Sequence, residues 1–210
     1  MNRFFITGTD TGVGKTVVAA ILTKILAGNY WKPIQTGITD DVLDRVTVKT
    51  LTDLPDHHFH ASTYELKPRL SPNHAAELEN VNIDIYQCHI PLTDRALIIE
   101  GAGGVFVPLN QQHSMLDLMA HINFPVIIVS RGTLGTLNHT LLTIHALRQR
   151  NIKIHGVIFS GELNPANQKT IEQWGNIRTL LHVPHFERIE KSKLYAWMEQ
   201  QKENILREFA

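Results

Sequence analysis

The chain has 210 residues, which is enough for one domain with a sizeable core or for two small ones. Hydrophobic residues make up 43% and charged residues 19%, a composition typical of globular proteins that excludes an intrinsically disordered chain. Twenty basic residues balance twenty acidic ones, so no overall basic field is available to bind nucleic acid or an anionic membrane.

Short apolar segments alternate with longer helical ones along the chain. Residues 3–6 predict a first strand, a glycine-rich loop follows, residues 15–27 predict a helix, and residues 29–32 predict a brief second strand. Further strands are predicted at 95–99, 125–129 and 152–159, and helices at 114–122, 136–150 and 164–174. Strands without polar alternation are buried on both faces, so the pattern predicts an α/β fold with a doubly wound, mainly parallel sheet flanked by helices.

The stretch 53–88 is less regular and predicts loops and short helices over one end of the sheet. It contains His57, His58 and His60, and imidazole is a common metal ligand. Because no cysteine stands at the spacing of a structural metal site, a solvated loop is favoured over a metal centre.

No apolar run is long enough for a signal peptide or a membrane span, since the longest, 17–26, is interrupted by Thr23 and Lys24. Cys88 cannot form an internal disulfide, which favours a cytoplasmic location, and it has no nearby activating group in sequence. A C-terminal helix of mixed charge is expected to pack its apolar stripe on the body or on a partner subunit, not on a membrane. The stripe consists of Leu194, Trp197, Met198, Ile205 and Phe209.

The strongest motif is GTDTGVGKT at residues 8–16, between the first strand and the first helix. Glycines let the backbone turn its N–H groups inward, and the helix start adds partial positive charge. Lys15 can reach the terminal phosphates of a nucleotide, and the Thr16 hydroxyl can ligate Mg²⁺. Five residues, not four, separate Gly8 from Gly14, so the usual motif fails at its first glycine. The loop predicts a single P-loop NTPase-like domain over residues 1–210, but it does not specify the reaction.

A carboxylate and a second lysine follow predicted strands. Glu100 comes directly after an apolar strand, so it emerges at the carboxyl edge of the sheet, where ligands bind. The glycine-rich residues 101–104 behind it keep the backbone unobstructed. Lys32 ends a short strand, and Pro33 restricts the chain direction there, so the ammonium can hold an anionic group. Spacing leaves open which residue supplies a second metal carboxylate: Asp40, Asp41 or Asp44.

Taken together, these motifs resemble the dethiobiotin synthetase family. The resemblance rests on residues 8–16, on KPIQTG at 32–37, on EGAGG at 100–104 and on LGTLNHT at 134–140, and it extends to about residue 159. The family has the same five-residue gap in its phosphate loop. The resemblance implies an ATP- and Mg²⁺-dependent ligase of biotin biosynthesis acting on 7,8-diaminononanoate and CO₂ or bicarbonate. In this reaction an amine forms a carbamate, ATP phosphorylates it, and the second amine closes the ureido ring with release of phosphate and ADP.

The resemblance also implies roles for individual residues. Nucleotide binding falls to Gly12, Val13, Gly14, Lys15, Thr16, Val17, Asp41, Glu100, Gly101, Ala102 and Gly103. Mg²⁺ binding falls to Thr16, Glu100 and Asp41, with Asp40 as the second choice for the aspartate. Lys15 and Lys32 are the expected catalytic residues, and Lys32 would steady the carbamate and the γ-phosphate. Substrate binding falls to Thr11, Thr36, Gly135 and Asn138, the last two from a neighbouring subunit, so a homodimer is implied.

Three departures from the family pattern are visible. Asn73 stands where the family often has histidine, and His74 follows it. The strand that usually leads to an adenine-reading asparagine leads here to Ser160 and Gly161, which predicts a relaxed nucleotide preference. The last forty residues match the family loosely.

Two other classes of protein carry similar loops. Nucleotide-switch ATPases of the partition or cell-division type share this kind of sheet and dimerise, but they typically carry an extra lysine where this chain has Thr9 and Asp10. The ligases related to cobyrinate amidases need a glutamine-hydrolysing domain, for which this chain has neither the length nor a Cys–His pair. A non-catalytic nucleotide binder would leave Lys32 and Glu100 without a role.

Overall fold

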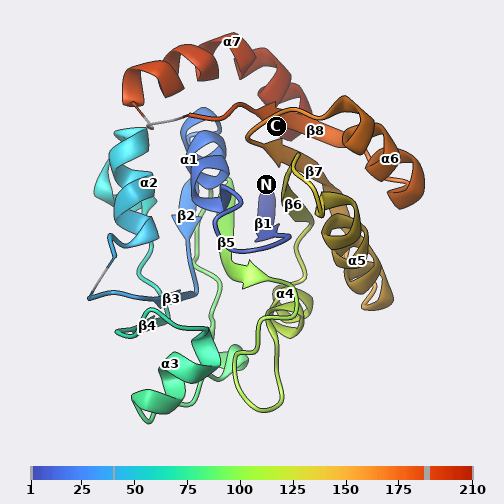
Figure 1. Ribbon diagram of the computed structural model, residues 1–210. Helices are drawn as coiled ribbons and strands as arrows, with labels where there is room; N and C mark the ends of the chain where they lie inside the picture. The colour runs from blue at the N-terminus through green and yellow to red at the C-terminus, as the bar shows by residue number, and fades with distance from the viewer. Residues whose placement is uncertain (1, 40, 187–189, 210) are drawn as a thin grey trace.

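The computed structural model describes residues 2–39, 41–186 and 190–209. Its centre is a six-stranded sheet in the order β2-β5-β1-β6-β7-β8, with every pair of neighbouring strands parallel (Figure 1). The strands are β1 (Arg3–Gly8), β2 (Asn29–Trp31), β5 (Leu97–Gly104), β6 (Val126–Arg131), β7 (Ile154–Ser160) and β8 (Thr179–Val183). This topology confirms the predicted doubly wound α/β fold, although the outer strand β8 is an addition that the sequence pattern did not predict.

The sheet separates two apolar cores, and alternate residues of one strand enter each of them. Phe5 belongs to one core, whereas Phe4 and Ile6 belong to the other. The helices that contribute to the Ile6 core are α1 (Lys15–Ile25), α2 (Asp44–Thr52) and α7 (Lys191–Phe209). The helices that contribute to the Phe5 core are α3 (Pro72–Leu78), α4 (Met115–Ile122), α5 (Thr136–Gln149) and α6 (Pro165–Gly175). Both faces of the sheet are therefore covered, which explains why its strands read as continuous apolar runs.

A second, two-stranded parallel sheet lies beside the main one and consists of β3 (Ile34–Thr36) and β4 (Tyr64–Leu66). Helix α3 (Pro72–Leu78) packs against both of its strands, and two short 3₁₀ helices, Asp56–His58 and Ile85–Gln87, belong to the same stretch of the chain, the first of them lying against β2. The sequence predicted the loops and short helices here but not the strands. Strands of three residues are too short to show periodicity, and these two pair across about thirty residues of chain.

Strand β5 is longer than predicted. It continues through Gly104, whereas the sequence predicted that the strand would end before Glu100. Gly104 pairs with Gly8 after a shift in register that follows the pairing of Ile6 with Glu100, and a Cβ atom on Gly104 would lie 3.3 Å from the Gly8 carbonyl oxygen. The glycines of this segment therefore let β5 run directly alongside the start of the phosphate loop.

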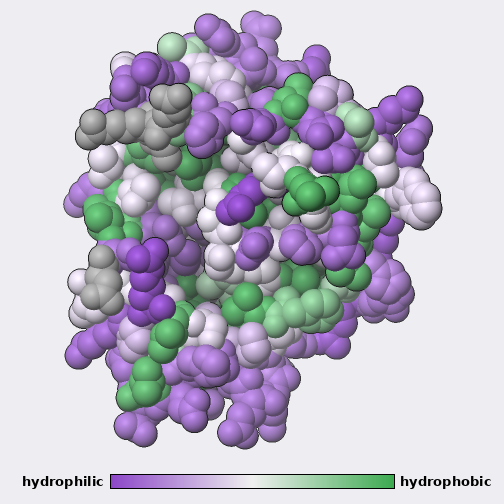
Figure 2. Space-filling model, in the orientation of Figure 1, coloured by the Kyte–Doolittle hydropathy of each residue, from purple (hydrophilic) through white to green (hydrophobic). Residues whose placement is uncertain are grey.

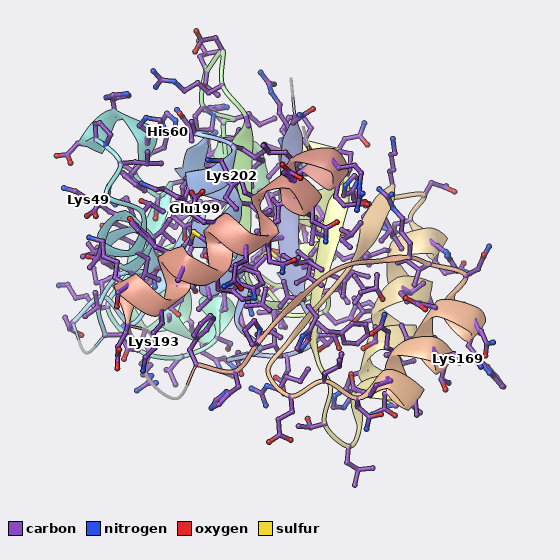
Figure 3. All side chains as sticks on the ribbon, turned by 90° about the horizontal axis from the view of Figure 1, so that it is seen from above. Lys49, His60, Lys169, Lys193, Glu199 and Lys202 are labelled. Carbon is purple, nitrogen blue, oxygen red and sulfur yellow. The ribbon has the colours of Figure 1, made fainter. Side chains whose placement is uncertain are left out.

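Helix α7 buries its apolar stripe against the body of the protein, as predicted. Four residues of the stripe are buried in the Ile6 core, and Trp197 packs partly against that core. The four are Leu194, Met198, Ile205 and Phe209. Lys193, Glu199 and Lys202 lie along the same helix in the view from above (Figure 3), and Lys202 forms an ion pair of 3.5 Å with Glu199. Within the described ranges, no helix is both long and apolar enough to cross a membrane.

Two of the three neighbouring histidines contact the edge of the main sheet. In the described part of the chain, no group of three or more His, Cys, Asp or Glu side chains is arranged to hold a metal ion by itself. His58 is buried, not solvated as expected, and its Nδ1 lies 2.7 Å from the Gly28 carbonyl oxygen. His60 Nε2 lies 2.7 Å from the Asn29 side-chain nitrogen. These contacts give the histidines a structural role in tying their loop to the edge of the sheet.

We expect Cys88 to be unreactive in the folded protein. Its side chain is 1% exposed, and burial raises the pKa of the thiol to about 11. At pH 8 the thiolate is therefore about a thousandth of the population. Titration with DTNB at pH 8 should find no reactive thiol in the native protein and one per chain in denaturant. Rapid labelling of the native protein would contradict this prediction.

Candidate active site

The phosphate loop crosses the space between the end of β1 and the start of α1. Gly14 immediately precedes α1 with φ +98°, and a Cβ atom there would lie 2.5 Å from the Ser160 hydroxyl oxygen, so glycine alone fits this position. The Lys15 side chain folds back over the loop, and its Nζ donates to the Asp10 carbonyl oxygen at 3.0 Å. Burial lowers the pKa of Lys15 to about 8. A bound phosphate would favour the charged ammonium and give it an anionic partner.

Hydroxyl, carboxylate and ammonium groups meet at the carboxyl edge of the sheet. The Thr16 hydroxyl lies 2.8 Å from Glu100 Oε1 and 3.1 Å from Asp44 Oδ1. The Lys32 ammonium forms an ion pair with Asp44 and lies 3.6 Å from Glu100 Oε1. The two lysines, the hydroxyl and the two carboxylates thus belong to one continuous polar centre, because Glu100 also acts electrostatically on Lys15.

Strand pairing explains how residues so distant in sequence come together. Trp31, the last residue of β2, pairs with Ile99 of β5. Lys32 directly after Trp31 therefore lies beside Glu100, which directly follows Ile99. Glu100 also pairs with Ile6 of β1, two residues before the phosphate loop begins. Asp44 is the first residue of α2, and its N–H donates to Gln35 Oε1 at 3.3 Å.

The electrostatics of this centre are those of buried charges that neutralise one another. Burial raises the pKa of Glu100, Asp44 raises it further, and the ammonium of Lys32 opposes both effects. Burial alone would lower the pKa of Lys32, but the carboxylates of Glu100 and Asp44 outweigh it and raise the pKa overall. Lys32 is therefore a firmly protonated cation held in a largely dry site.

One open cavity of 910 Å³ brings most of the predicted site residues together. Its predicted members are Thr11, Gly12, Gly14, Lys15, Thr16, Val17, Lys32, Thr36, Asp41, Glu100, Ala102 and Gly103. Two predicted residues lie behind the surface of the cavity: Val13 is packed into the apolar core, and Gly101 is buried against the ring of Phe5. Gln35, Arg69 and Ser71 also line the cavity, although the sequence did not single them out as site residues.

The structure groups a different aspartate with Thr16 and Glu100 than the sequence favoured. Asp41 Oδ2 lies 2.9 Å from Arg69 Nε in an exposed ion pair, whereas Asp44 contacts Thr16 and Lys32. Asp40, the second choice, lies outside the described residues. The signal that could have identified Asp44 is its position at the start of a helix, where a carboxylate is favoured by the helix dipole.

The predicted substrate residues from a neighbouring subunit lie elsewhere on the chain. Gly135 immediately precedes α5, and Asn138 lies in its first turn. Among the described residues that line the 910 Å³ cavity, neither of these two is present. Asn73 accepts a hydrogen bond of 2.8 Å from Ser71 and lines a separate polar pocket.

A second cavity of 530 Å³ adjoins the phosphate loop on the side of β7 and β8. Gly12, Gly14 and Val17 line its inner end. The outer end is lined by Ser160 and by residues 183–186, which include His185 and Phe186.

Comparison with known proteins identifies the family. A family model described as an AAA domain matches residues 2–193. The ATP-dependent dethiobiotin synthetase BioD of Paramagnetospirillum magneticum (strain ATCC 700264 / AMB-1) is 44% identical over 183 residues, covering 87% of this chain and 88% of that protein. This chain belongs to the dethiobiotin synthetase family. The expectation from the sequence motifs is thereby confirmed.

Other members of the dethiobiotin synthetase family match over a similar length. BioD of Rhodopseudomonas palustris (strain BisA53) is 42% identical over 194 residues, covering 92% of this chain and 91% of that protein. The biotin biosynthesis bifunctional protein BioCD of Bordetella avium (strain 197N) is also 42% identical, over 196 residues. The match covers 93% of this chain but 42% of that protein, so the chain corresponds to one part of the bifunctional protein.

Solved structures support the fold of this dethiobiotin synthetase family member. The complex of a Cyanothece McdA variant with ATP superposes with a TM-score of 0.59 at 13% identity, covering 99% of this chain and 96% of that one. A putative plasmid partition protein from Borrelia burgdorferi B31 bound to AMPPNP gives 0.57 at 14% identity, covering 99% and 97%. At such low identity the likeness shows the P-loop NTPase fold alone. The partition-type alternative therefore shares the architecture of this chain, whereas the sequence match is to dethiobiotin synthetases.

Proposed function

We propose that this protein is an ATP-dependent dethiobiotin synthetase of biotin biosynthesis. It would close the ureido ring of dethiobiotin from 7,8-diaminononanoate and CO₂, with bicarbonate as the source of CO₂. The observation that carries the proposal is the convergence of Lys15, Thr16, Lys32 and Glu100 on one cavity beside the phosphate loop. The free thiol of Cys88 supports a cytoplasmic location, where thiols stay reduced.

The donor set in this cavity fits Mg²⁺. The Thr16 hydroxyl lies within hydrogen-bond distance of carboxylate oxygens of both Asp44 and Glu100, and hard oxygen donors are the ligands that Mg²⁺ prefers. Mg²⁺ commonly takes one or two carboxylates and completes its shell with substrate phosphates and water, so two carboxylates and a hydroxyl suffice. We therefore assign Thr16, Asp44 and Glu100 to the ion, with Asp44 in the role expected of Asp41. When bound, the ion would supply neutralisation of the negative charge on the transferring phosphate.

The chain itself contributes anion binding and orientation. Backbone N–H groups of residues 12–17 would bind the nucleotide phosphates, with the Lys15 ammonium beside the γ-phosphate. Lys32 would exchange part of its pairing with Asp44 for the substrate carbamate and hold the carbamate oxygen toward the phosphorus. The carbamate oxygen would attack the γ-phosphorus, so that a P–O bond forms and the bond from that phosphorus to ADP breaks. The second amine would then attack the carbamoyl carbon and lose a proton; a C–N bond forms, and the bond between that carbon and the phosphorylated oxygen breaks with release of inorganic phosphate. Thr11 and Thr36 line the same cavity and would contact the substrate there.

A homodimer would complete the substrate site. Phe106, Leu134 and Leu142 are large apolar residues exposed at 66%, 104% and 56%, and such exposure is typical of interaction surfaces. Phe106 and Leu142 line the same shallow pocket, and Leu134 adjoins Gly135. Figure 2 shows hydrophobic patches among hydrophilic residues on one face of the molecule. Covering this apolar surface with a second copy would bring Gly135 and Asn138 of that copy toward the substrate.

We expect a relaxed nucleotide preference. In the family pattern an asparagine reads adenine, and its amide offers both a donor and an acceptor, whereas Ser160 offers one hydroxyl. GTP, CTP and UTP should support turnover within about tenfold of ATP, since the hydrogen bonds of one amide account for roughly that ratio. Lys15→Ala removes a phosphate contact common to all four nucleotides and should weaken the binding of each by the same factor. A strict ATP requirement in the turnover assay would contradict the prediction.

The decisive experiment is direct product formation. Purified protein is mixed with 7,8-diaminononanoate, ¹³C-bicarbonate, Mg²⁺ and ATP, and the product is analysed by mass spectrometry. The labelled cyclic urea should form together with equimolar ADP, and omission of the diamine should suppress ADP release. ATP hydrolysis without the cyclic product would instead favour the nucleotide-switch class.

A further inference from the structure

Glu100 is a buried carboxylate whose two oxygens have different partners. The residue is 1% exposed. Oε1 accepts a hydrogen bond of 2.8 Å from the Thr16 hydroxyl and lies 3.6 Å from the Lys32 ammonium. Oε2 accepts a hydrogen bond of 2.8 Å from the phenol of Tyr30. Oε1 therefore faces Thr16 and Lys32 in the polar centre, whereas Oε2 is held by Tyr30.

The position of Tyr30 follows from the pairing of β2 with β5. Tyr30 pairs with Ile98, and Ile98 and Glu100 project to the same face of β5 because they are two residues apart. Tyr30 is fully buried in the Ile6 core together with Ile98. On its other side, the Tyr30 carbonyl oxygen accepts a hydrogen bond of 2.9 Å from the His60 N–H. Packing and backbone pairing thus hold the phenol hydroxyl in one place.

We propose that Tyr30 is a positioning residue that locks the Glu100 carboxylate with Oε1 toward Thr16, Asp44 and Lys32. This inference rests on the proposed function, because it takes Glu100 as a ligand of the nucleotide-bound divalent cation. A buried carboxylate oxygen without a donor bears the full cost of its lost hydration. Without the phenol, the Glu100 carboxylate would rotate so that both of its oxygens share the remaining donors, Thr16 and Lys32. Oε1 would then no longer be positioned beside the oxygens of Thr16 and Asp44 to bind the cation. Tyr30 acts through Glu100 and does not reach the substrate itself.

The test is the Tyr30→Phe variant, which keeps the ring and removes the hydroxyl. Binding of Mn²⁺, used as the spectroscopic probe for the divalent site, is measured by electron paramagnetic resonance at saturating ADP. The Mn²⁺ dissociation constant should rise about tenfold, as expected for the loss of a hydrogen bond to a charged group. Binding of ADP in the presence of EDTA should stay within twofold of wild type, because the phosphate loop is untouched.

Tyr64→Phe is the matched control. The Tyr64 hydroxyl donates to the Asp84 carbonyl oxygen at 3.2 Å in the small sheet, outside the 910 Å³ cavity. This variant loses the same atom, and its Mn²⁺ affinity should equal that of wild type. Equal weakening in both variants would indicate a general loss of stability and would overturn the role of Tyr30.

Glu100→Gln separates the inference from the function on which it rests. If Glu100→Gln loses Mn²⁺ binding while Tyr30→Phe binds it like wild type, the role of Tyr30 is overturned and the proposed metal site stands. If Glu100→Gln keeps wild-type Mn²⁺ affinity, the metal assignment and the inference both fall. A loss in Glu100→Gln with an intermediate loss in Tyr30→Phe supports both.

Discussion

Replacing Lys32 with alanine is expected to lower the rate of ring formation by about two to three orders of magnitude while ATP binding survives. Lys32 is a buried, firmly protonated cation between Asp44 and Glu100, and it lines the cavity beside the phosphate loop. The nucleotide phosphates are bound by the loop and by Lys15, so their ground-state binding does not depend on Lys32. Charge that develops on the carbamate and on the transferring phosphate does depend on it. Removing one such electrostatic group lowers turnover by about 10²–10³-fold.

Two measurements check this expectation. Cyclic urea formation is followed by mass spectrometry, and the ADP dissociation constant is measured by calorimetry and should change by less than about threefold. Lys49→Ala is the control: Lys49, labelled in Figure 3, is a half-exposed lysine of α2 that pairs with Asp56 and is not among the residues that line the cavity, so its loss should leave turnover unchanged. Normal turnover by Lys32→Ala would end the assignment of this residue.

The second large effect concerns the two competing aspartates. Asp44→Asn should raise the Mg²⁺ concentration that gives half-maximal activity by about tenfold or more, because it removes one of two carboxylate charges beside Thr16. It should also lower turnover, since Lys32 loses its ion-pair partner. Both constants come from the Mg²⁺ dependence of product formation.

Asp41→Asn is the comparison variant that decides whether Asp44 or Asp41 binds the metal. Asp41 pairs with the exposed Arg69, and exposed pairs contribute at most about 1 kcal/mol, so its Mg²⁺ requirement should change little. The reverse ranking, with Asp41→Asn the more damaging substitution, would restore the aspartate that the sequence favoured and would contradict the arrangement around Asp44.

Much of the site was accessible from the sequence because its parts are short and local. The phosphate loop is a continuous motif, and its context between β1 and α1 follows from adjacent apolar patterns. Glu100 was predictable because a carboxylate directly after a buried apolar run lies at the edge of a parallel sheet. Lys32 was predictable for the same reason, with Pro33 fixing the direction of the chain.

Residues that belong to no continuous motif were harder to place. Asp44 stands among three nearby aspartates, and its selection depends on where α2 begins and on the fold of the loop before it. Tyr30 sits in a strand of three residues, and its hydroxyl meets Glu100 only through pairing with a strand that begins almost seventy residues later. The strands β3 and β4 were missed because three-residue strands show no periodicity of their own.

The amino-acid sequence by itself indicated the fold class, the nucleotide loop, the two lysines and the carboxylate of Glu100 within β5, because local patterns and family motifs encode them. The tertiary structure decided which aspartate joins Thr16 and which side chain supports Glu100. Those choices depend on strand register and on the path of the chain between elements, and register brings together side chains that are far apart in the sequence.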